Sequence, residues 1–335
     1  MTRFAGTPVS QYAGLTPHWR TGGLAYWCTE GVSVSILVVG SVFFDSIETL
    51  HGKADRTLGG AATYFAVAAS FFAPVRMVAA VGEDFPREEL DFLSRRGIDL
   101  AGLQIRPGLT GSWAGRYHED MNQRDTLQLD LNVFADFQPQ VPASYRDAQY
   151  VFLANIDPRL QAMVLDQLAA PSLVGCDTMN HWISGSRGEL EQLLGRVDVL
   201  VINDEEARLL SGERNVVRAA RRLLAMGPRR VLIKRGEYGV IQFSADSVFA
   251  VPAFPLEEVF DPTGAGDSFA GGFMGELARS GDTSEAGLRR AIVYGSVIAS
   301  FVVEDFGMRR LRALTPELIE RRFRQFISLT DVNGN

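Results

Sequence analysis

Short apolar runs recur along most of this 335-residue chain, and they limit the folds that are open to it. Strands that are buried on both faces of a parallel sheet have such continuous apolar sequence. The predicted strands are Ile36–Gly40, Val75–Val81, Leu100–Arg106, Tyr150–Leu153, Ser172–Asp177, Val199–Asn203, Val231–Lys234, Val240–Phe243 and Val248–Val251. Helical patterns alternate with them, at Ala61–Phe72, at Pro86–Arg96, from about Arg159, up to about Gly195 and in the last quarter. The alternation predicts an α/β fold built from a βα series.

Composition excludes several classes of function. With 46% hydrophobic residues the chain can bury a large core, as one large α/β unit or as two domains. The net charge of -7 argues against a surface for nucleic acid or for an anionic membrane, which would concentrate Lys and Arg. Cys28 and Cys176 provide neither a disulfide framework nor a metal cluster, which favours a reducing, cytoplasmic location. No stretch of eighteen apolar residues predicts a membrane span.

Both ends of the chain lack a regular pattern. Residues 1–33 contain scattered charges and no sustained apolar stretch, so we expect no secretory signal there. Three interpretations of this extension remain open: a disordered segment, an extra arm, or a start codon assigned too early. Residues 331–335 are expected to be a short tail after a domain that spans residues 34–330.

The run DPTGAGDSFAGGF (Asp261–Phe273) carries the most chemical information. Its glycines allow a sharp turn, and the helix expected over Ser268–Leu277 places free backbone N–H groups at its positive end, where an anion would bind. Asp267 is a fixed negative charge beside that anion, and accepting a proton from an attacking hydroxyl would explain its presence. The alternative is that Thr263 or Asp267 only caps the helix.

The whole run resembles the signature of the ribokinase-like, or PfkB, carbohydrate kinases. The resemblance extends from about Ile36 to at least Gly307. It implies a three-layer α/β/α core with a mostly parallel sheet and a small β-sheet lid, and it implies ATP and Mg²⁺ as cofactors. It also implies that Asp267 is the catalytic base and that the amides of Gly264, Ala265 and Gly266 form an anion hole.

Two stretches interrupt the βα series, at about residues 43–58 and 108–132. They contain short β-prone segments and lack the period of a crossover helix. We therefore predict that the two stretches pair with each other to form a small sheet. The resemblance implies that this sheet is a lid over the acceptor, which excludes water, and that a homodimer through the lid is possible. The alternative is an ordinary surface hairpin.

The resemblance also implies positions that bind the acceptor. Asp45 matches an aspartate that binds acceptor hydroxyls, and Gly59 and Gly60 match paired glycines at the junction of lid and core. Where ribokinases proper have Lys and Asn, this chain has Ala61 and Tyr64, which remove hydrogen-bonding capacity and add a flat apolar face. Ribose itself is therefore not favoured. Asn180, in a segment loosely similar to one in sugar-acid kinases, is a further candidate for contact with acceptor or phosphate.

Other motifs are assigned to the nucleotide and to metal ions. The NDEE segment resembles the family's NxxE motif, which implies that Asn203 and Glu206 order Mg²⁺ through water; its alternative is an acidic helix start. KRGEYG resembles a turn beside the nucleotide and supplies Lys234, Gly236 and Gly239. The region of Asp261, Thr263 and the loop Val302–Gly307 resembles a site for a monovalent cation such as K⁺, held mainly by backbone oxygens.

Arginines and aromatics in or beside the predicted lid have two interpretations each. Arg106, Arg116 and Arg124 would read a phosphate on the acceptor or, because acidic residues lie among them, form a solvated mixed-charge face, which is the favoured interpretation. The aromatic side chains would stack on a nucleobase or form the lid's own small core. They are Trp113, Tyr117 and Phe134.

The sequence thus predicts an ATP-dependent kinase that phosphorylates an alcohol group of a small sugar, polyol or nucleoside. One alternative is an adenosine-like nucleoside kinase specifically. Another is a noncatalytic relative that only binds a ligand, which the presence of Asp267, Asn203 and Glu206 disfavours.

Overall fold

The computed structural model describes residues 34–330, so the predictions for residues 1–33 and 331–335 lie outside the described residues. Within it, a nine-stranded sheet has the order β13-β12-β11-β10-β9-β8-β1-β4-β5. Its strands are β5 (Ile98–Arg106), β4 (Val75–Gly82), β1 (Ile36–Val39), β8 (Tyr150–Leu153), β9 (Leu173–Asp177), β10 (Val199–Asn203), β11 (Arg230–Lys234), β12 (Val240–Phe243) and β13 (Val248–Val251). The strands from β5 to β11 are parallel, and β12 and β13 add an antiparallel edge.

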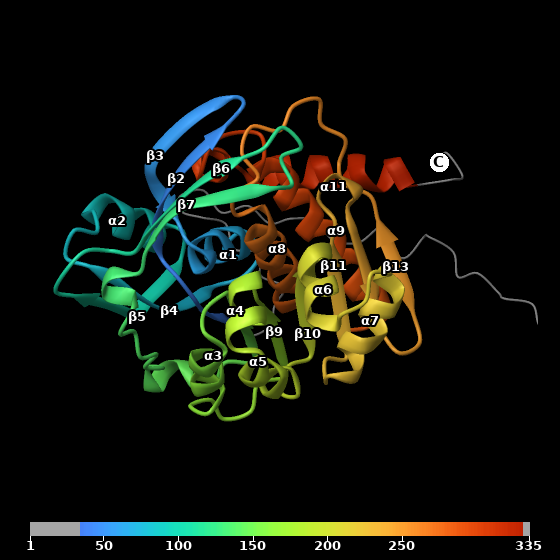
Figure 1. Cartoon of the computed structure of the whole chain (residues 1–335), viewed down its shortest axis with the longest axis horizontal. Coiled ribbons are helices and arrows are strands. Elements are labelled where there is room, and N and C mark those ends of the chain that lie inside the picture. Colours follow the sequence, from blue (N-terminus) through green and yellow to red (C-terminus); the bar gives the residue numbers. More distant parts are fainter. Residues whose placement is uncertain (1–33, 331–335) are drawn as a thin grey trace, which may run out of the picture.

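Successive residues of the central strands face different helical layers. In β1, Ile36 and Val38 belong to one buried cluster, and Leu37 and Val39 belong to the other. The first cluster includes α1 (Ala61–Ala69), α2 (Arg87–Arg95), α8 (Ala265–Ser280), α9 (Glu285–Val302), α10 (Arg309–Ala313) and α11 (Pro316–Thr330). The second includes α3 (Pro158–Leu165), α4 (Asn180–Gly185), α5 (Arg187–Leu194), α6 (Asp204–Ser211) and α7 (Val216–Ala225). The predicted three-layer α/β/α core is confirmed (Figure 1).

A separate small sheet is built from the two stretches that interrupt the βα series. Its order is β3-β2-β6-β7, with β2 (Phe43–Thr49), β3 (Gly52–Gly59), β6 (Ser112–Tyr117) and β7 (Arg124–Asp130). The pairs β2–β3 and β6–β7 are antiparallel, whereas β2–β6 is parallel, which joins the two stretches into one sheet. It lies beside the ends of α1 and α8 (Figure 1).

Three helices differ from their predicted limits. The helix expected over Ala61–Phe72 ends at Ala69, because the chain turns at Ser70 toward β4. The segment expected to end near Gly195 as one helix is two helices, α4 and α5, which meet at Ser186 with an extended φ of -138°. Helix α8 begins at Ala265, three residues before the predicted start, so the GAGD residues form its first turn.

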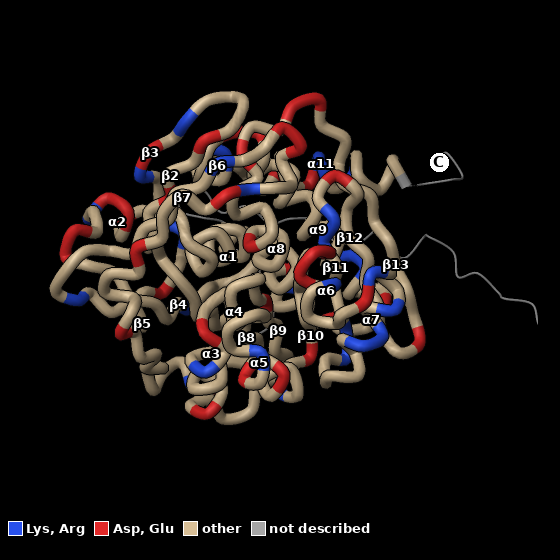
Figure 2. The backbone as a smooth tube through the Cα atoms, viewed as in Figure 1, with Lys and Arg blue, Asp and Glu red and all other residues tan. Residues whose placement is uncertain are grey.

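Residues of both charges lie side by side on several elements of the fold. Figure 2 shows basic and acidic residues interspersed on α2, α6 and the small sheet alike. Among residues 34–330, no helix combines the length and the apolar character that a bilayer span requires.

Candidate active site

The turn before α8 is held by a buried carboxylate and by a close approach to α1. Asp261 accepts hydrogen bonds from the amide of Thr263 and from the amide of Gly307, both at 2.8 Å, and so ties this turn to the loop after α9. Gly264 has a φ of 75°, and a Cβ there would lie 2.3 Å from ring carbons of Tyr64. Only glycine satisfies both conditions.

The first turn of α8 presents backbone donors. Among the described residues, the amides of Gly264 and Gly266 have no intramolecular acceptor, as is usual for the first residues of a helix. The amide of Ala265 differs from the prediction, because it donates to the carbonyl oxygen of Pro262 at 3.2 Å. Gly266 lies beside Lys234, since a Cβ at Gly266 would be 2.5 Å from Lys234 Nζ. Backbone dipoles and a cation therefore converge on one anion-binding position.

Asp267 lies in this first turn next to a second carboxylate, Asp177, the last residue of β9. Part of residue Asp267 is exposed to solvent. Burial of its carboxyl group raises the pKa of Asp267, and the positive charge of Lys234 opposes the rise. Burial also raises the pKa of Asp177 far above its usual value, and the charge of Asp267 adds to the effect. Sequence reasoning placed the segment that begins at Asp177 at this edge of the sheet, as it did Asn203, but assigned the role to Asn180 and none to Asp177.

The small sheet supplies the carboxylate predicted to bind the acceptor. Asp45 on β2 is 5% exposed, and a Cβ at Gly59 would lie 2.0 Å from Asp45 Oδ2. Burial raises the pKa of Asp45 to about 7, a hydrogen bond from the Gly60 amide lowers it, and the charges of Asp261 and Asp267 raise it further. Asp45, Gly59 and Gly60 therefore lie together. Tyr64, which is 1% exposed, lies beneath Gly264 and supports the turn.

These shifts predict how stability depends on pH without ligands. Between pH 4 and 7 folded Asp45 keeps a proton that the unfolded chain releases, so the free energy of unfolding falls as pH rises through this window, by up to roughly 4 kcal/mol. Asp177, Glu206, Asp261 and Asp267 shift in the same direction. We expect a lower melting temperature at pH 8 than at pH 5, and a smaller difference in Asp45→Asn. Equal differences in the two proteins would contradict the assignment to Asp45.

The residues predicted to bind the nucleotide lie at the ends of β10 and β11. Asn203 and Glu206 form a reciprocal capping box: Asn203 Oδ1 accepts from the Glu206 amide at 2.7 Å, and Glu206 Oε2 accepts from the Asn203 amide at 3.0 Å. Burial raises the pKa of Glu206, and Lys234 opposes the rise. The capping box uses one oxygen of each side chain. Asn180 lies nearby and donates to Glu205 at 3.3 Å.

The hairpin between β6 and β7 reaches both halves of the site. The hydroxyl of Thr263 donates to Tyr117 Oη at 3.1 Å, and a Cβ at Gly236 would lie 2.1 Å from Asn122 Oδ1. The hairpin thus contacts the turn before α8 and also the predicted nucleotide turn that ends at Gly239. Sequence reasoning missed Asn122, whose signal is only its place in a polar turn.

The aromatic residues of this region have separate roles. Phe134 is 8% exposed and stacks on Phe137 in the core, and Tyr117 is buried in the small cluster of the lid sheet. Trp113 is half-buried, and its indole N–H donates to Thr126 at 3.2 Å. Trp113 is therefore the one of these three that is not fully buried.

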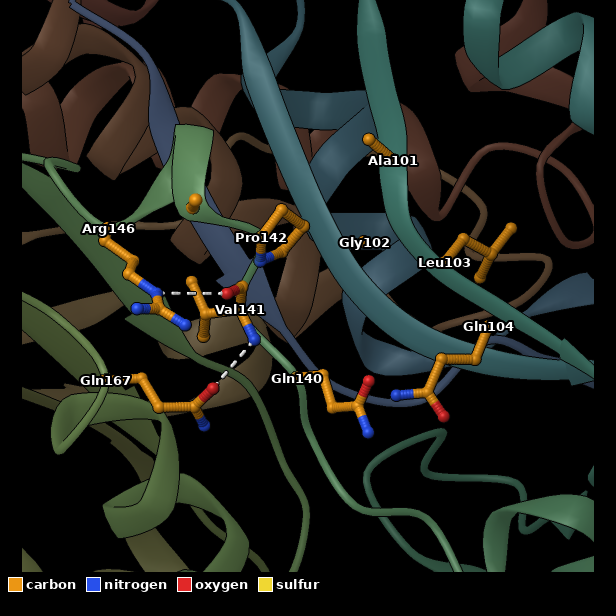
Figure 3. A pocket seen from close by; sticks show the side chains of 10 residues that line it. Ala101, Gly102, Leu103, Gln104, Gln140, Val141, Pro142, Arg146 and Gln167 are labelled. Carbon is orange, nitrogen blue, oxygen red and sulfur yellow. Dashed lines mark hydrogen bonds between the residues drawn. The ribbon is translucent and has the colours of Figure 1, made fainter.

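A second concavity lies apart from these residues. Figure 3 shows a pocket of about 440 Å³ beside the edge strand β5, lined by Gln104, Val141, Arg146, Gln167 and their neighbours. None of the residues that line it belongs to the site described above. Two polar side chains of this pocket are already bound to the backbone of Val141: the Arg146 guanidinium donates to its carbonyl oxygen, and the Gln167 side-chain oxygen accepts from its amide. This pocket is therefore separate from the residues around Asp267 that were predicted to carry the chemistry.

Comparison with known proteins places the chain in a family. The model described as pfkB family carbohydrate kinase matches residues 34–313. The chain belongs to the pfkB family of carbohydrate kinases. Members transfer a phosphoryl group from ATP, with a divalent metal ion, to an alcohol group, so the chain is an ATP-dependent kinase for a sugar or nucleoside alcohol.

Two relatives and one solved structure define its position in the pfkB family. A cytidine kinase from Thermococcus kodakarensis is 34% identical over 267 residues, which is 77% of this chain and 95% of the relative. A nucleoside kinase from Methanothermobacter thermautotrophicus is 29% identical over 279 residues, which is 82% of this chain and 85% of the relative. The structure of a Burkholderia thailandensis nucleoside kinase with inosine has a TM-score of 0.69 at 21% identity, over 88% of this chain and 99% of that one.

Proposed function

We propose that this pfkB kinase phosphorylates a hydroxyl group of a nucleoside. The observation that carries the proposal is the extended similarity to a cytidine kinase and to a nucleoside kinase. Two features of the site support it: Ala61 and Tyr64, both buried, stand where ribokinases proper have polar residues, and the half-buried Trp113 is paired with Asp45 across β6 and β2. An aromatic face suits a nucleobase better than a small sugar.

Asp267 is the general base in this proposal. It lies in the same helical turn as the free amides of Gly264 and Gly266, so a hydroxyl beside its carboxylate faces the phosphoryl group that those amides bind. Its pKa, raised by burial, lies nearer to neutral pH than that of an ordinary carboxylate, which makes it a better proton acceptor. The acceptor oxygen attacks the γ-phosphorus in line, the bond to the β–γ bridging oxygen breaks, and the proton passes to Asp267.

Asp45 orients the acceptor in this proposal. A carboxylate accepts hydrogen bonds from two hydroxyls, which a ribose ring presents on neighbouring carbons. A side chain at Gly59 would collide with Asp45, and one at Gly60, whose amide donates to Asp45, would collide with the backbone of Ser41 and Phe43. Tyr64 acts through Gly264, because it fills the space beneath the turn. Asn180 remains a proposed contact for acceptor or phosphate, through an amide that now binds Glu205.

Lys234 and the turn at Gly236 and Gly239 face the ATP phosphates, with Asn203 and Glu206 beside them. Among residues 34–330, no cluster of three or more Asp, Glu, His or Cys side chains is arranged to hold a metal ion. The oxygen atoms of Asn203 and Glu206 suit Mg²⁺, which keeps several waters and binds mainly through substrate phosphates. Bound Mg²⁺ would neutralise phosphate charge, while Glu206 and Asn203 hold its waters in place.

A monovalent cation such as K⁺ is proposed near Asp261 and Thr263. Each oxygen of Asp261 already accepts a backbone hydrogen bond, so backbone oxygens of this turn and of the loop Val302–Gly307 would supply the ligands. The proposed homodimer through the lid is supported by the exposed Leu127 and Leu129 on β7, the outer strand of the small sheet. A molecular mass of one chain at all concentrations in sedimentation would contradict the dimer.

A panel of acceptors tests the proposed function. ATP consumption is measured with Mg²⁺, with and without K⁺, against cytidine, uridine, adenosine, inosine, ribose, fructose and a polyol. We expect the highest kcat/KM with a nucleoside. Turnover restricted to free sugars would overturn the nucleoside assignment, and turnover with none of these acceptors would favour a ligand-binding relative.

A further inference from the structure

Three arginines in and beside the small sheet, which the sequence pattern placed on one mixed-charge face, lie in different environments. Arg116 pairs with Glu48 at 3.1 Å, and Arg106 donates to the carbonyl oxygen of Val133 at 3.1 Å. Arg124 has neither an ion pair nor a hydrogen bond among residues 34–330; its guanidinium lies 5.9 Å from the centre of the Trp113 ring. Arg124 is therefore the one of the three that is available for a ligand.

Strand register determines which way Arg124 faces. Side chains directly opposite one another on paired strands share a face of the sheet, and successive residues alternate between faces. Arg124 is directly opposite Tyr117 on β6. Trp113, Gly115 and Tyr117 alternate along β6 and so share one face, and Trp113 is paired with Asp45 on β2. Arg124 therefore lies on the same face as Asp45. Since Tyr117 reaches Thr263, this face looks onto the start of α8. Arg116, one residue before Tyr117, lies on the opposite face.

Electrostatics agree with this placement. Burial has the largest effect on Asp45, Tyr117, Glu206 and Asp267 and raises the pKa of each, whereas the positive charge of Arg124 acts in the opposite direction on all four. Asp45 and Tyr117 belong to the acceptor side, and Glu206 belongs to the nucleotide side. The guanidinium is therefore close enough to act on carboxylates of both sides.

The hairpin already contacts the core around this position. Arg124 is the first residue of β7, and Asn122, two residues earlier, lies against Gly236. Tyr117, opposite Arg124, is hydrogen-bonded to Thr263. Contacts on both sides thus hold the strand end over the path between the two substrates.

The geometry points to Arg124 as a catalytic residue that binds the phosphoryl group during its transfer. The role rests on the phosphoryl transfer proposed above. The carboxylates of Asp45, Asp177 and Asp267 lie around the proposed reaction site, and a bound triphosphate adds further negative charge. Lys234 compensates part of this negative charge from the core, and Arg124 would compensate more of it from the lid. A guanidinium fork matches two phosphoryl oxygens at once. Arg124 forms no covalent bond and moves no proton.

Nucleotide binding without acceptor tests this role directly. The affinities of wild type and Arg124→Ala for ATP and for ADP are measured by calorimetry with Mg²⁺. We expect the variant to bind ATP roughly tenfold more weakly and ADP unchanged, because only ATP has the γ-phosphoryl group. With acceptor, kcat should fall on the order of 10²-fold, and Arg124→Lys should recover part of the loss.

Arg116→Ala is the matched control, since it removes an arginine from the other face of the same sheet. It should leave both affinities and kcat near the wild-type values. The role would be overturned if Arg124→Ala had the same nucleotide affinities and kcat as Arg116→Ala. It would also be overturned if Arg124→Ala weakened the binding of ATP and of ADP equally. If wild type phosphorylates no acceptor, the proposed function fails, while the comparison of ATP with ADP still decides the role of Arg124.

Discussion

Replacing Asp267 with Asn should lower kcat by about 10³-fold or more, because the amide cannot accept the proton of the attacking hydroxyl. The substitution preserves size and leaves the backbone donors at the start of α8 in place. ATP should therefore bind with an affinity within about threefold of wild type, well below the tenfold change that the loss of 1.4 kcal/mol would produce. Initial rates at saturating ATP and acceptor, together with calorimetric ATP binding, measure the two effects separately.

Asp166→Asn provides the control for this prediction. Asp166 lies on the surface and pairs with Arg196 at 2.8 Å, away from the site, so its loss should not change kcat. A kcat of Asp267→Asn within about tenfold of wild type would remove Asp267 from the role of base, because such a loss is smaller than general base catalysis typically contributes.

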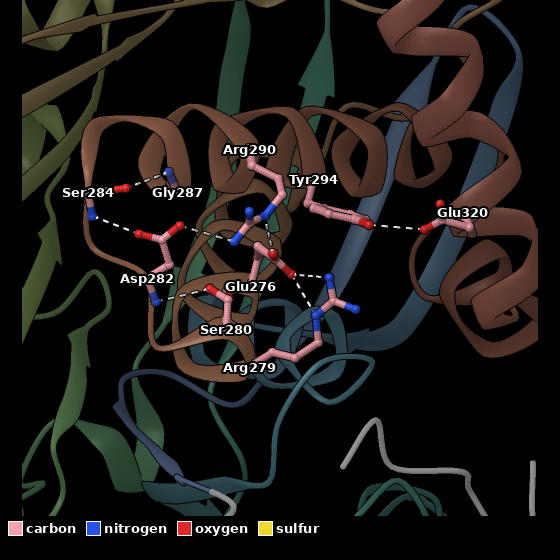
Figure 4. Close-up of polar contacts among 9 residues, drawn as sticks. All are labelled: Glu276, Arg279, Ser280, Asp282, Ser284, Gly287, Arg290, Tyr294 and Glu320. Atoms are coloured by element: carbon pink, nitrogen blue, oxygen red, sulfur yellow. Dashed lines mark hydrogen bonds and ion pairs between the residues drawn. The ribbon is translucent and has the colours of Figure 1, made fainter. Parts of the chain in front are cut away.

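Replacing Glu276 with Gln should produce a large loss of stability. Glu276 lies on α8, the helix that carries Asp267, and is 1% exposed; Figure 4 shows its carboxylate between Arg279 and Arg290, with contacts of 2.5 Å and 2.7 Å. Gln removes the negative charge that the two guanidiniums share, and although Arg290 also lies 3.6 Å from Asp282 and Arg279 contacts the Tyr294 ring, breaking such a largely buried ion pair is strongly destabilising. We expect the free energy of unfolding to fall by about 3 kcal/mol, measured by urea titration, with kcat unchanged under conditions where the protein is folded.

The matched control is Glu191→Gln, which breaks an ion pair on the surface of α5. Glu191 and Arg187 are each about half exposed and lie 2.9 Å apart, so the loss should be about 0.5 kcal/mol or less. Equal losses in the two variants would show that the Glu276 cluster contributes no more than a surface pair. A fall in kcat of folded Glu276→Gln would instead show that this cluster affects the geometry of the site.

Local patterns were sufficient to predict the central layers. The continuous apolar runs at Ile36–Gly40 and Tyr150–Leu153 predicted strands buried on both faces, and such strands form the middle of the sheet. Helix limits were less accurate at Ala69 and Ala265, because the first and last turns of a helix depend on contacts that the pattern does not contain. Ala265 joins α8 through its bond to the carbonyl oxygen of Pro262, and that bond removes one amide from the predicted anion hole.

The sequence by itself determined the fold class, the family and the turn with Asp267 that is proposed to bind phosphate, because each depends on residues that are close along the chain. Only the tertiary structure decided which distant groups meet there: Asp177 beside Asp267, Tyr64 beneath Gly264, and Arg124 on the sheet face whose Tyr117 reaches Thr263. The physical reason is strand register. Because the side chains of a strand alternate between its faces, a shift of one residue would move Arg124 to the opposite face of the small sheet, and that register is set by pairing across the sheet.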